Sequence, residues 1–353
     1  MTTSPRSPRT PVPADRTVLH AFPGQGDFAV SALVRAARAH AAVGEALSEV
    51  CEEVDPVGAE FGIGPLGPAL LGSTPPSGRD LARAAVGTSQ LALFVSSMAV
   101  HRALCAVGLV PDRVLGMSFG DIAACTAAGT FTLAGGARIA CQAGLVLHGR
   151  QGGLTLLEAG ADAARHLIAA AGASHVVLAC VNDPSQVVLS GPLRELEPVE
   201  ELAGRRGLPA VRLRLPFLCH HPSLAPVAEA FAEAVRHVPA RAPRVPVYSS
   251  VLGRAYSSQD DIHWALAQGL VRPALLPDAL RQAATPSPVL LLEAGTGSSL
   301  THSARRVLPP HLADARATMA EADFPWLRPG SLTRLVPAPV EPPSAEVSCD
   351  VRP

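Results

Sequence analysis

The fold is decided by residues 114–125, which read VLGMSFGDIAAC. A short apolar run ends here at a Gly-x-Ser-x-Gly pentapeptide, and an Ala-rich segment follows directly. A buried strand that turns so sharply into a helix is a nucleophile elbow, which exposes a serine above a parallel sheet. A Cβ at Gly116 or Gly120 would crowd the crossing of strand and helix. The stretch therefore predicts an α/β-hydrolase-like domain with a parallel sheet, and Ser118 is its candidate nucleophile.

Strand-like and helix-like segments alternate on both sides of this elbow, as a parallel sheet requires. The expected strands include 17–22, 245–251 and 289–293. The expected long helices are 29–54, one that contains 91–104, 223–237 and 260–284. These segments predict a catalytic domain built from 17–150 and 216–316.

The segment 151–215 has a different order of elements. It reads strand, helix, strand, strand, helix and strand, in the ranges 153–158, 161–171, 175–181, 186–190, 193–206 and 210–215. That βαββαβ order is the ferredoxin-like split βαβ arrangement. We therefore expect a small ferredoxin-like subdomain inserted into the larger domain. A disordered N-terminal tail (1–16) and a Pro-rich, irregular C-terminal tail (317–353) are expected at the two ends.

Composition excludes several classes of function. The 29 basic and 30 acidic residues leave a formal net charge of −1, so no basic field attracts nucleic acid. All 29 basic residues are Arg, and the absence of Lys excludes pyridoxal phosphate enzymes and Schiff-base aldolases. The seven Cys lack the spacing of a disulfide framework or a metal site. Without a secretory signal or an apolar run that could cross a bilayer, a cytoplasmic protein with no metal is expected.

A serine is a weak nucleophile at neutral pH and needs a base. Among the 12 His, His220 and His221 are the best placed, because they follow a predicted strand and precede a helix. His20, His40 and His101 fall inside a predicted strand or predicted helices, so we expect them to be structural or surface residues. The N–H of Phe119 lies at the start of the helix after the serine, where the helix dipole also favours an oxyanion.

Six motifs occur in the same order as in a known family. They are FPGQG (22–26), TSQLA (88–92), VLGMSFGD (114–121), VNDP with VVLSG (181–191), CHHP (219–222) and LEAGTG (292–297). They span about residues 18–308, nearly the whole ordered chain. With these motifs and the inserted subdomain, the chain resembles the malonyl-CoA:acyl carrier protein transacylase family, which includes the acyltransferase domains of polyketide synthases.

The resemblance implies a role for each matching residue. Ser118 is the acyl-accepting nucleophile and His220 its general base. The N–H groups of Gln25 and Phe119 form the oxyanion hole, and a backbone carbonyl, matched here to Gly269, orients the histidine. The implied reaction is ping-pong transfer, in which a CoA or acyl-carrier-protein thioester acylates the serine and a second thiol then attacks it. No tightly bound cofactor is implied beyond the phosphopantetheine thioester of the substrate, and a monomer is expected.

The sequence departs from the family at positions that select the acyl group. Met117 replaces the usual His before the nucleophile, and FLCH at 217–220 matches neither the malonyl nor the methylmalonyl signature. Ala143 occupies the position of the Arg that pairs with the free carboxylate of a malonyl group. A carboxylate entering this pocket would lose a charge-assisted pair worth about 1.5–3 kcal/mol, unless Arg150 replaces the missing cation.

The expected acyl pocket collects the side chains that the resemblance places around the serine. They are Gln90, Met117, Ala143, Asn182, Phe217 and Cys219. Carrier proteins are acidic, so basic docking positions are expected near the mouth. The candidates are the pairs Arg205-Arg206 and Arg305-Arg306.

We expect a trans-acting acyltransferase of polyketide-type biosynthesis that moves an uncarboxylated acyl group, such as a starter, aminoacyl or modified chain. An editing acyl-thioester hydrolase on the same scaffold stays open, and so does a malonyl transacylase with a relocated Arg. An idle scaffold that docks carrier proteins is disfavoured by the intact Ser118 and His220. A general lipase or esterase is disfavoured because no acidic residue is placed in the order Ser–Asp–His.

Overall fold

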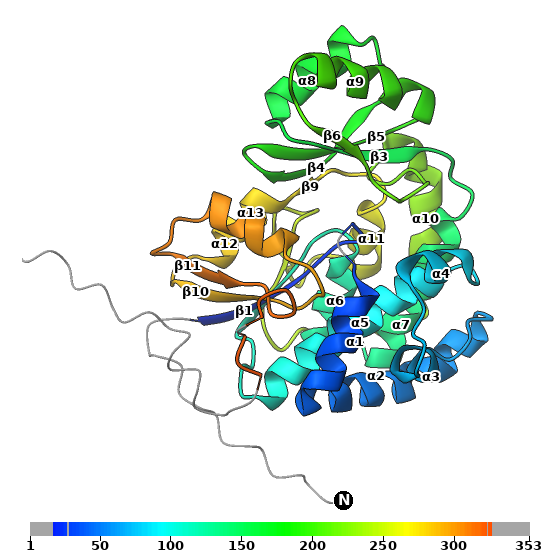
Figure 1. Cartoon of the computed structure of the whole chain (residues 1–353), viewed down its shortest axis with the longest axis vertical. Helices are drawn as coiled ribbons and strands as arrows, with labels where there is room; N and C mark the ends of the chain where they lie inside the picture. The colour runs from blue at the N-terminus through cyan, green and yellow to red at the C-terminus, as the bar shows by residue number, and fades with distance from the viewer. Residues whose placement is uncertain (1–16, 27, 323, 327–353) are drawn as a thin grey trace, which may run out of the picture.

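The structure is a computed structural model, and it describes residues 17–26, 28–322 and 324–326. Its centre is a six-stranded sheet in the order β11-β10-β1-β2-β7-β8 (Figure 1). The strands are β1 Thr17–Phe22, β2 Arg113–Gly116, β7 Val247–Ser249, β8 Arg254–Ala255, β10 Val289–Glu293 and β11 Ala313–Arg316. All neighbours pair in parallel except β8, which is antiparallel to β7. Because β1 and β10 are buried on both faces, they have the continuous apolar sequences of central parallel strands.

Alternate residues of β1 belong to two hydrophobic cores, one on each face of the sheet. Val18 and Phe22 pack against a large helical layer. That layer contains α1 Val30–Ala39, α2 Ala41–Glu60, α3 Leu66–Leu71, α4 Gly78–Arg83, α5 Thr88–Ala106, α6 Gly120–Ala127, α7 Leu133–Leu147, α10 Ala225–Val235 and α11 Ile262–Gln268. Leu19 and Ala21 point the other way, toward α12 Leu276–Ala283 and α13 Ser299–Val307. The sheet thus separates a broad helical side from the side on which the small subdomain lies.

The small subdomain has the predicted βαββαβ order. Its elements are β3 Gly153–Leu157, α8 Ala161–Ala170, β4 Val177–Asp183, β5 Gln186–Gly191, α9 Leu193–Arg205 and β6 Ala210–Arg212. Its sheet has the order β6-β3-β5-β4-β9, in which β9 (Ala274–Leu275) pairs in parallel with β4. Helices α8 and α9 cover the outer face, and the inner face is turned to the large sheet (Figure 1). β9 comes from outside 151–215, so our proposed subdomain shares its sheet with the larger domain.

Two of the predicted long helices are wrong, because each is interrupted. The helix expected over 29–54 breaks at His40, whose backbone is extended with φ −132° and ψ 112°. The helix expected over 260–284 ends at Gln268, and β9 separates it from α12. Pro273 and Pro277 explain the second break, since a proline disfavours helical backbone at the residue before it. No proline or glycine marks the break at His40.

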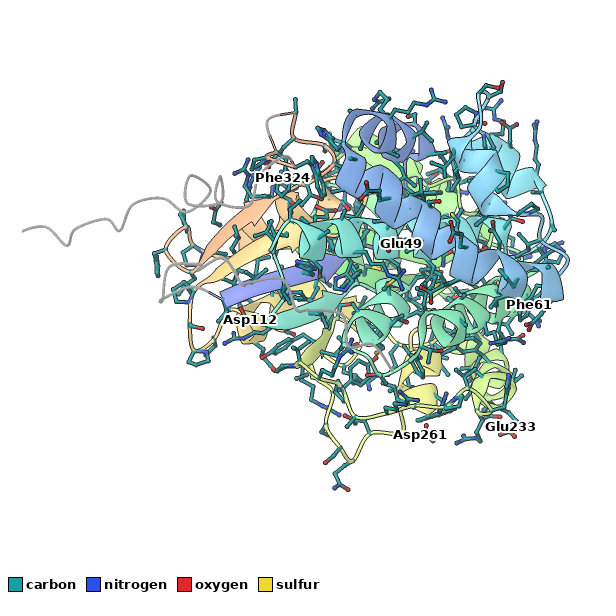
Figure 2. All side chains as sticks on the ribbon, turned by 90° about the horizontal axis from the view of Figure 1, so that it is seen from below. Glu49, Phe61, Asp112, Glu233, Asp261 and Phe324 are labelled. Carbon is teal, nitrogen blue, oxygen red and sulfur yellow. The ribbon has the colours of Figure 1, made fainter. Side chains whose placement is uncertain are left out.

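The described part of the C-terminal segment has no helix or strand after β11, but it is packed. Phe324 and Trp326 are each 4% exposed and belong to the hydrophobic core of the large helical layer, and Figure 2 labels Phe324. The predicted tail 1–16 and the stretch 327–353 lie outside the described residues. None of the helices within the described ranges combines the length and the apolar character needed to cross a membrane.

Candidate active site

The elbow is formed by β2, Ser118 and α6, as the sequence predicts. Ser118 has φ 55°, and His220, with φ 53°, is the other non-glycine residue with positive φ among those described. Left-handed backbone costs such residues roughly 1–2 kcal/mol, so the surrounding contacts must hold both in place. A Cβ at Gly116 would lie 2.2 Å from Oδ1 of Asp121, and one at Gly120 would lie 2.1 Å from the carbonyl oxygen of Phe22. Both positions therefore need glycine, as expected.

Ser118 and His220 form a hydrogen-bonded pair. Oγ of Ser118 lies 2.6 Å from Nε2 of His220, and Nδ1 of His220 lies 2.7 Å from the backbone carbonyl oxygen of Arg272. A carbonyl oxygen only accepts, so Nδ1 carries the proton. Nε2 is then the free acceptor that a general base needs, and it faces the serine hydroxyl.

The expectation that Gly269 orients the histidine is wrong. Gly269 lies directly after α11, and its carbonyl oxygen is 3.9 Å from Sγ of Cys219. The carbonyl that reaches His220 belongs to Arg272, three residues further along the loop to β9. As the resemblance implies, a backbone carbonyl accepts the hydrogen bond from the histidine. Which residue supplies that carbonyl depends on how the loop turns after α11.

The environment of His220 keeps its imidazole neutral. The side chain is 3% exposed. Burial lowers the pKa of His220 from 6.5 to about 4, although the Arg272 carbonyl acts in the opposite direction. At neutral pH the ring is therefore ready to accept a proton.

Two backbone N–H groups beside the serine are available to an oxyanion. The N–H of Ser118 itself donates to Oγ of Ser250 over 3.0 Å. Within the described ranges, the N–H groups of Gln25 and Phe119 have no acceptor in the protein. Gln90 does not line the cavity that opens over Ser118 and His220; its Nε2 donates to Oε1 of Gln25 over 2.8 Å and so holds that loop.

A cavity of about 410 Å³ opens over Ser118 and His220, between the inner face of the small sheet and the large domain. Four of the predicted pocket residues line it: Met117, Asn182, Phe217 and Cys219. Seven further lining side chains are aliphatic: Leu154, Leu156, Val188, Leu213, Leu215, Leu276 and Leu300. The polar lining residues besides Ser118 and His220 include Gln25, Gln186, Ser298, Ser299, His302 and Ser303. Among the described residues, no Arg, Asp or Glu lines this cavity.

Ala143 lines a second, smaller cavity on the other side of the serine. It has about 30 Å³ and shares Gln25, Ser118 and Cys219 with the main cavity. Its remaining wall is largely apolar: Phe119, Ile122, Ala143, Leu147, Phe231, Leu266 and Leu270. The side chain of Arg150 is exposed and donates to the carbonyl oxygen of Val146, and Arg150 lines neither cavity.

A buried polar network beneath the elbow escaped the sequence analysis. Oδ2 of Asp121 accepts hydrogen bonds from Oγ of Ser249 over 2.5 Å and from the hydroxyl of Tyr256 over 2.9 Å. Burial raises the pKa of Asp121 to about 7, against the effect of these two hydrogen bonds. The network fixes the end of β7 next to Ser250, which holds the N–H of Ser118. Single serines and tyrosines in loops offer no sequence signal for such a network.

The four predicted docking arginines have different surroundings. Arg205 is exposed and pairs with Glu201 on its own helix, and Arg206 is exposed. Arg305 donates to the carbonyl oxygen of Ala315 and pairs with Glu321. Arg306 instead reaches the small subdomain, where it donates to Oγ of Ser185 over 2.9 Å.

Comparison with known proteins places this geometry in context. The model of the acyl transferase domain family matches residues 17–320. Malonyl-CoA:acyl carrier protein transacylase from Xanthomonas oryzae is 26% identical with a TM-score of 0.75, and the match covers 88% of this chain and 96% of that one. The acyl transferase domain of SpnD, solved with 2-(pent-4-yn-1-yl)malonyl, is 25% identical with a TM-score of 0.74, over 94% of this chain and 79% of that one.

A curated relative is much longer than this chain. Phenolphthiocerol synthesis polyketide synthase type I of Mycobacterium marinum is 29% identical over 226 residues, which are 63% of this chain and 11% of that protein. The chain spans about a tenth of the length of the curated relatives it matches. The similarity therefore concerns one domain of those synthases.

Proposed function

Since the chain belongs to the acyl transferase domain family, we propose that it moves an uncarboxylated acyl group between thiols through an ester on Ser118. The donor is a CoA or carrier-protein thioester, and the acceptor is the phosphopantetheine thiol of an acyl carrier protein. We also propose that the chain acts in trans in polyketide-type biosynthesis.

In the proposed mechanism, His220 takes the proton of Ser118 as Oγ attacks the thioester carbonyl. The 2.6 Å contact between Oγ and Nε2 supports this step. The N–H groups of Gln25 and Phe119 stabilise the oxyanion, and collapse of the intermediate expels the donor thiolate, which takes the proton from His220. The acceptor thiol then attacks the acyl ester by the same steps in reverse, with His220 again moving the proton.

The lack of an Arg among the described lining residues of the two cavities carries the choice of an uncarboxylated acyl group. A malonyl carboxylate would meet Ala143 and aliphatic side chains where the family places an Arg. An unpaired carboxylate in such a site costs several kcal/mol after relaxation, hence roughly a thousandfold or more in rate. A neutral acyl group avoids this cost and packs against the leucines.

Mass spectrometry of the intact protein tests the proposal. The protein is incubated with malonyl-, acetyl-, butyryl- and hexanoyl-CoA and with β-alanyl-N-acetylcysteamine, and Ser118→Ala serves as the control. We expect the mass of an uncarboxylated acyl group on the wild-type protein and none on the variant. Malonylation as fast as the best neutral donor would overturn the proposal, and its loss in Arg150→Ala would identify a relocated cation. Release of free acid in place of transfer would identify the editing hydrolase.

We also propose a cytoplasmic monomer without a tightly bound cofactor. The six described cysteines, Cys51, Cys105, Cys125, Cys141, Cys180 and Cys219, are all free thiols, which suits a reducing compartment. Size-exclusion chromatography with light scattering checks the oligomeric state.

A further inference from the structure

The main cavity has one wall from each part of the molecule. The small subdomain contributes Asn182 from β4 and Gln186 and Val188 from β5. The large domain contributes α13 and the residue before it, through Ser298, Ser299, Leu300, His302 and Ser303. The width of the cavity therefore depends on how α13 is held against the hairpin formed by β4 and β5.

Helix α13 is fixed at both ends. At its first turn, the buried carboxylate of Glu293, at the end of β10, accepts hydrogen bonds from the N–H groups of Leu300 and Thr301 over 3.2 and 2.8 Å. At its last turn, Arg306 extends to the β4–β5 hairpin. The first contact anchors the helix in the large sheet, and the second joins it to the small subdomain.

Arg306 meets three polar side chains of the small subdomain. Its Nη1 lies 2.9 Å from Oγ of Ser185, 3.5 Å from Oδ2 of Asp183 and 3.9 Å from Oε2 of Glu158. The side chain of Asp183 is 0% exposed, whereas that of Arg306 is 39% exposed. Among the described residues, Arg306 is the cation that pairs with this buried carboxylate. An exposed ion pair contributes little to the stability of the fold, but removing the cation from a buried carboxylate strongly destabilises the fold.

The contact continues into the cavity wall through two amides. Nε2 of Gln186 donates to Oε1 of Glu158 over 2.8 Å, and Nδ2 of Asn182 donates to Oε1 of Gln186 over 2.8 Å. Both amides line the cavity. Arg306 thus lies at the end of a set of polar contacts that orients two lining side chains.

We propose that Arg306 is a positioning residue that latches the small subdomain to α13 and so sets the width of the acyl cavity. The inference rests on the proposed function only in taking this cavity to be the place of the acyl group. It is an alternative to the docking role expected for Arg306, whose Nη1 is engaged within the protein. With the latch intact, the cavity holds the acyl group closely and limits the access of water to acyl-Ser118.

Loss of the latch is expected to act in two ways. A wider cavity binds the acyl group less well, which raises KM and leaves kcat nearly unchanged, because the contacts of Ser118 and His220 are untouched. Water also gains access to the acyl-enzyme. It attacks the ester carbonyl, the bond to Oγ breaks, and the free acid leaves while Oγ regains a proton by way of His220.

The test compares Arg306→Gln with Arg305→Gln in the full chain, using hexanoyl-N-acetylcysteamine as the acyl donor and pantetheine as the acceptor thiol, so that docking of a carrier protein does not enter. Arg305 is the matched control because it lies one residue earlier on α13 and contacts Ala315 and Glu321 instead. For Arg306→Gln we expect KM for the donor to rise about tenfold and kcat of transfer to pantetheine to change less than about twofold, whereas hydrolysis of hexanoyl-Ser118, measured without pantetheine, accelerates about fivefold. Arg305→Gln is expected to stay within about twofold of wild type in all three, and Arg306→Lys to recover most of the loss.

A second variant protects the test against misfolding. If Arg306→Gln does not fold, Asp183→Asn combined with Arg306→Gln removes the unpaired buried charge and should show the same higher KM and faster hydrolysis. Equal behaviour of Arg306→Gln and Arg305→Gln, or wild-type kinetics in the folded double variant, would overturn the latch. Should malonyl-CoA prove the better donor, the proposed function fails, but the contrast between Arg306 and Arg305 is then measured with malonyl-CoA and still decides the latch.

Discussion

His220 and His221 are neighbours in the sequence, yet only one of the two rings reaches Ser118. Nδ1 of His221 lies 2.6 Å from Oγ of Ser223, and its Nε2 lies 3.0 Å from the carbonyl oxygen of His175. The ring of His221 therefore caps the short helix that follows and ties the loop to the small subdomain. We expect His220→Ala to slow acylation by roughly 10²–10⁴-fold, since it removes the proposed general base. His221→Ala should lose less than about fivefold in rate and about 1 kcal/mol of stability, as a lost cap does.

Rapid-quench measurement of acyl-Ser118 from hexanoyl-CoA checks this contrast, and thermal unfolding shows that both variants are folded. If His221→Ala proved the crippling change and His220→Ala the mild one, the assignment of the base would be wrong by one position.

The lowered pKa of His220 makes a prediction about pH. The proposed base works only when its imidazole is neutral, and burial lowers the pKa of His220 to about 4 in the free protein. Acylation should therefore keep its full rate from pH 8 down to about 5.5 and reach half of it only near the folded pKa. Single-turnover acylation at each pH, with circular dichroism to confirm folding, provides the profile. A half-point near 6.5 would show that the imidazole titrates as an exposed histidine does.

At the scale of residues, the sequence predicts side chains better than backbone partners. Ser118 and His220 are recognisable because their chemistry requires those residue types. The carbonyl that orients His220 belongs to Arg272 and not to Gly269, because any residue has a carbonyl and only the path of the loop selects one. Ser250, which binds the N–H of Ser118, is missed for the same reason: a serine hydroxyl in a loop has no distinguishing pattern.

At the scale of elements, α7 determines what surrounds the far side of the serine. Ala143 lies on this helix, is 4% exposed, and faces the 30 Å³ cavity. An Arg there would fill that cavity, push against the apolar wall and bring a cation to Ser118. We expect Ala143→Arg to raise malonyl transfer about tenfold or more while it lowers neutral acyl transfer by a similar factor. Competition between malonyl-CoA and hexanoyl-CoA for acyl-Ser118, read by mass, measures the switch.

Ala143→Leu is the matched control for that experiment, because it fills space without charge. It should lower transfer of both acyl groups and leave their ratio unchanged within about threefold. A ratio that moves as far in Ala143→Leu as in Ala143→Arg would mean that volume, and not charge, decides the substrate.

Element order was predictable wherever apolar periodicity and turn residues agree. β1, β10 and the six elements of the small subdomain follow that rule, and their observed bounds differ from the predicted ones by three residues at most. The break between α1 and α2 at His40 was not predictable, since no proline or glycine marks it. The addition of β9 to the small sheet was equally hidden, because two residues between Pro273 and α12 carry no strand signal; only the parallel pairing with β4 makes them a strand.

At the scale of the whole molecule, the candidate active site and the core share one feature: each contains a buried imidazole whose pKa is lowered by burial. His20 on β1 and His101 on α5 meet behind the sheet, with their Nδ1 atoms 2.9 Å apart. Burial lowers the pKa of His101 to about 4, helped by the charges of Arg102 and Arg244, and places the pKa of His20 well below 6.5. In the hydrogen bond between the two rings, one Nδ1 donates its proton and the other Nδ1 accepts with its lone pair. Protonating both rings would therefore break this hydrogen bond.

These two histidines predict that acid weakens the fold. Their folded pKa values lie below the unfolded value of about 6.5, so the stability they contribute is complete above pH 6.5 and is lost as pH falls toward 4. Asp121 acts in the opposite sense, because its pKa is raised to about 7 and its contribution to stability is lost as pH rises through that value.

Replacing both rings, with His20→Leu and His101→Leu together, removes the effect of the two histidines and leaves that of Asp121. We expect the drop in melting temperature between pH 7 and pH 5 to be smaller by about 3 °C or more than in wild type. The exposed His148→Leu, followed by the same calorimetric scans, should keep the wild-type drop. An unchanged drop in the double variant would mean that the buried pair does not govern the acid response, and that His220, whose pKa is lowered by the same burial, carries it instead.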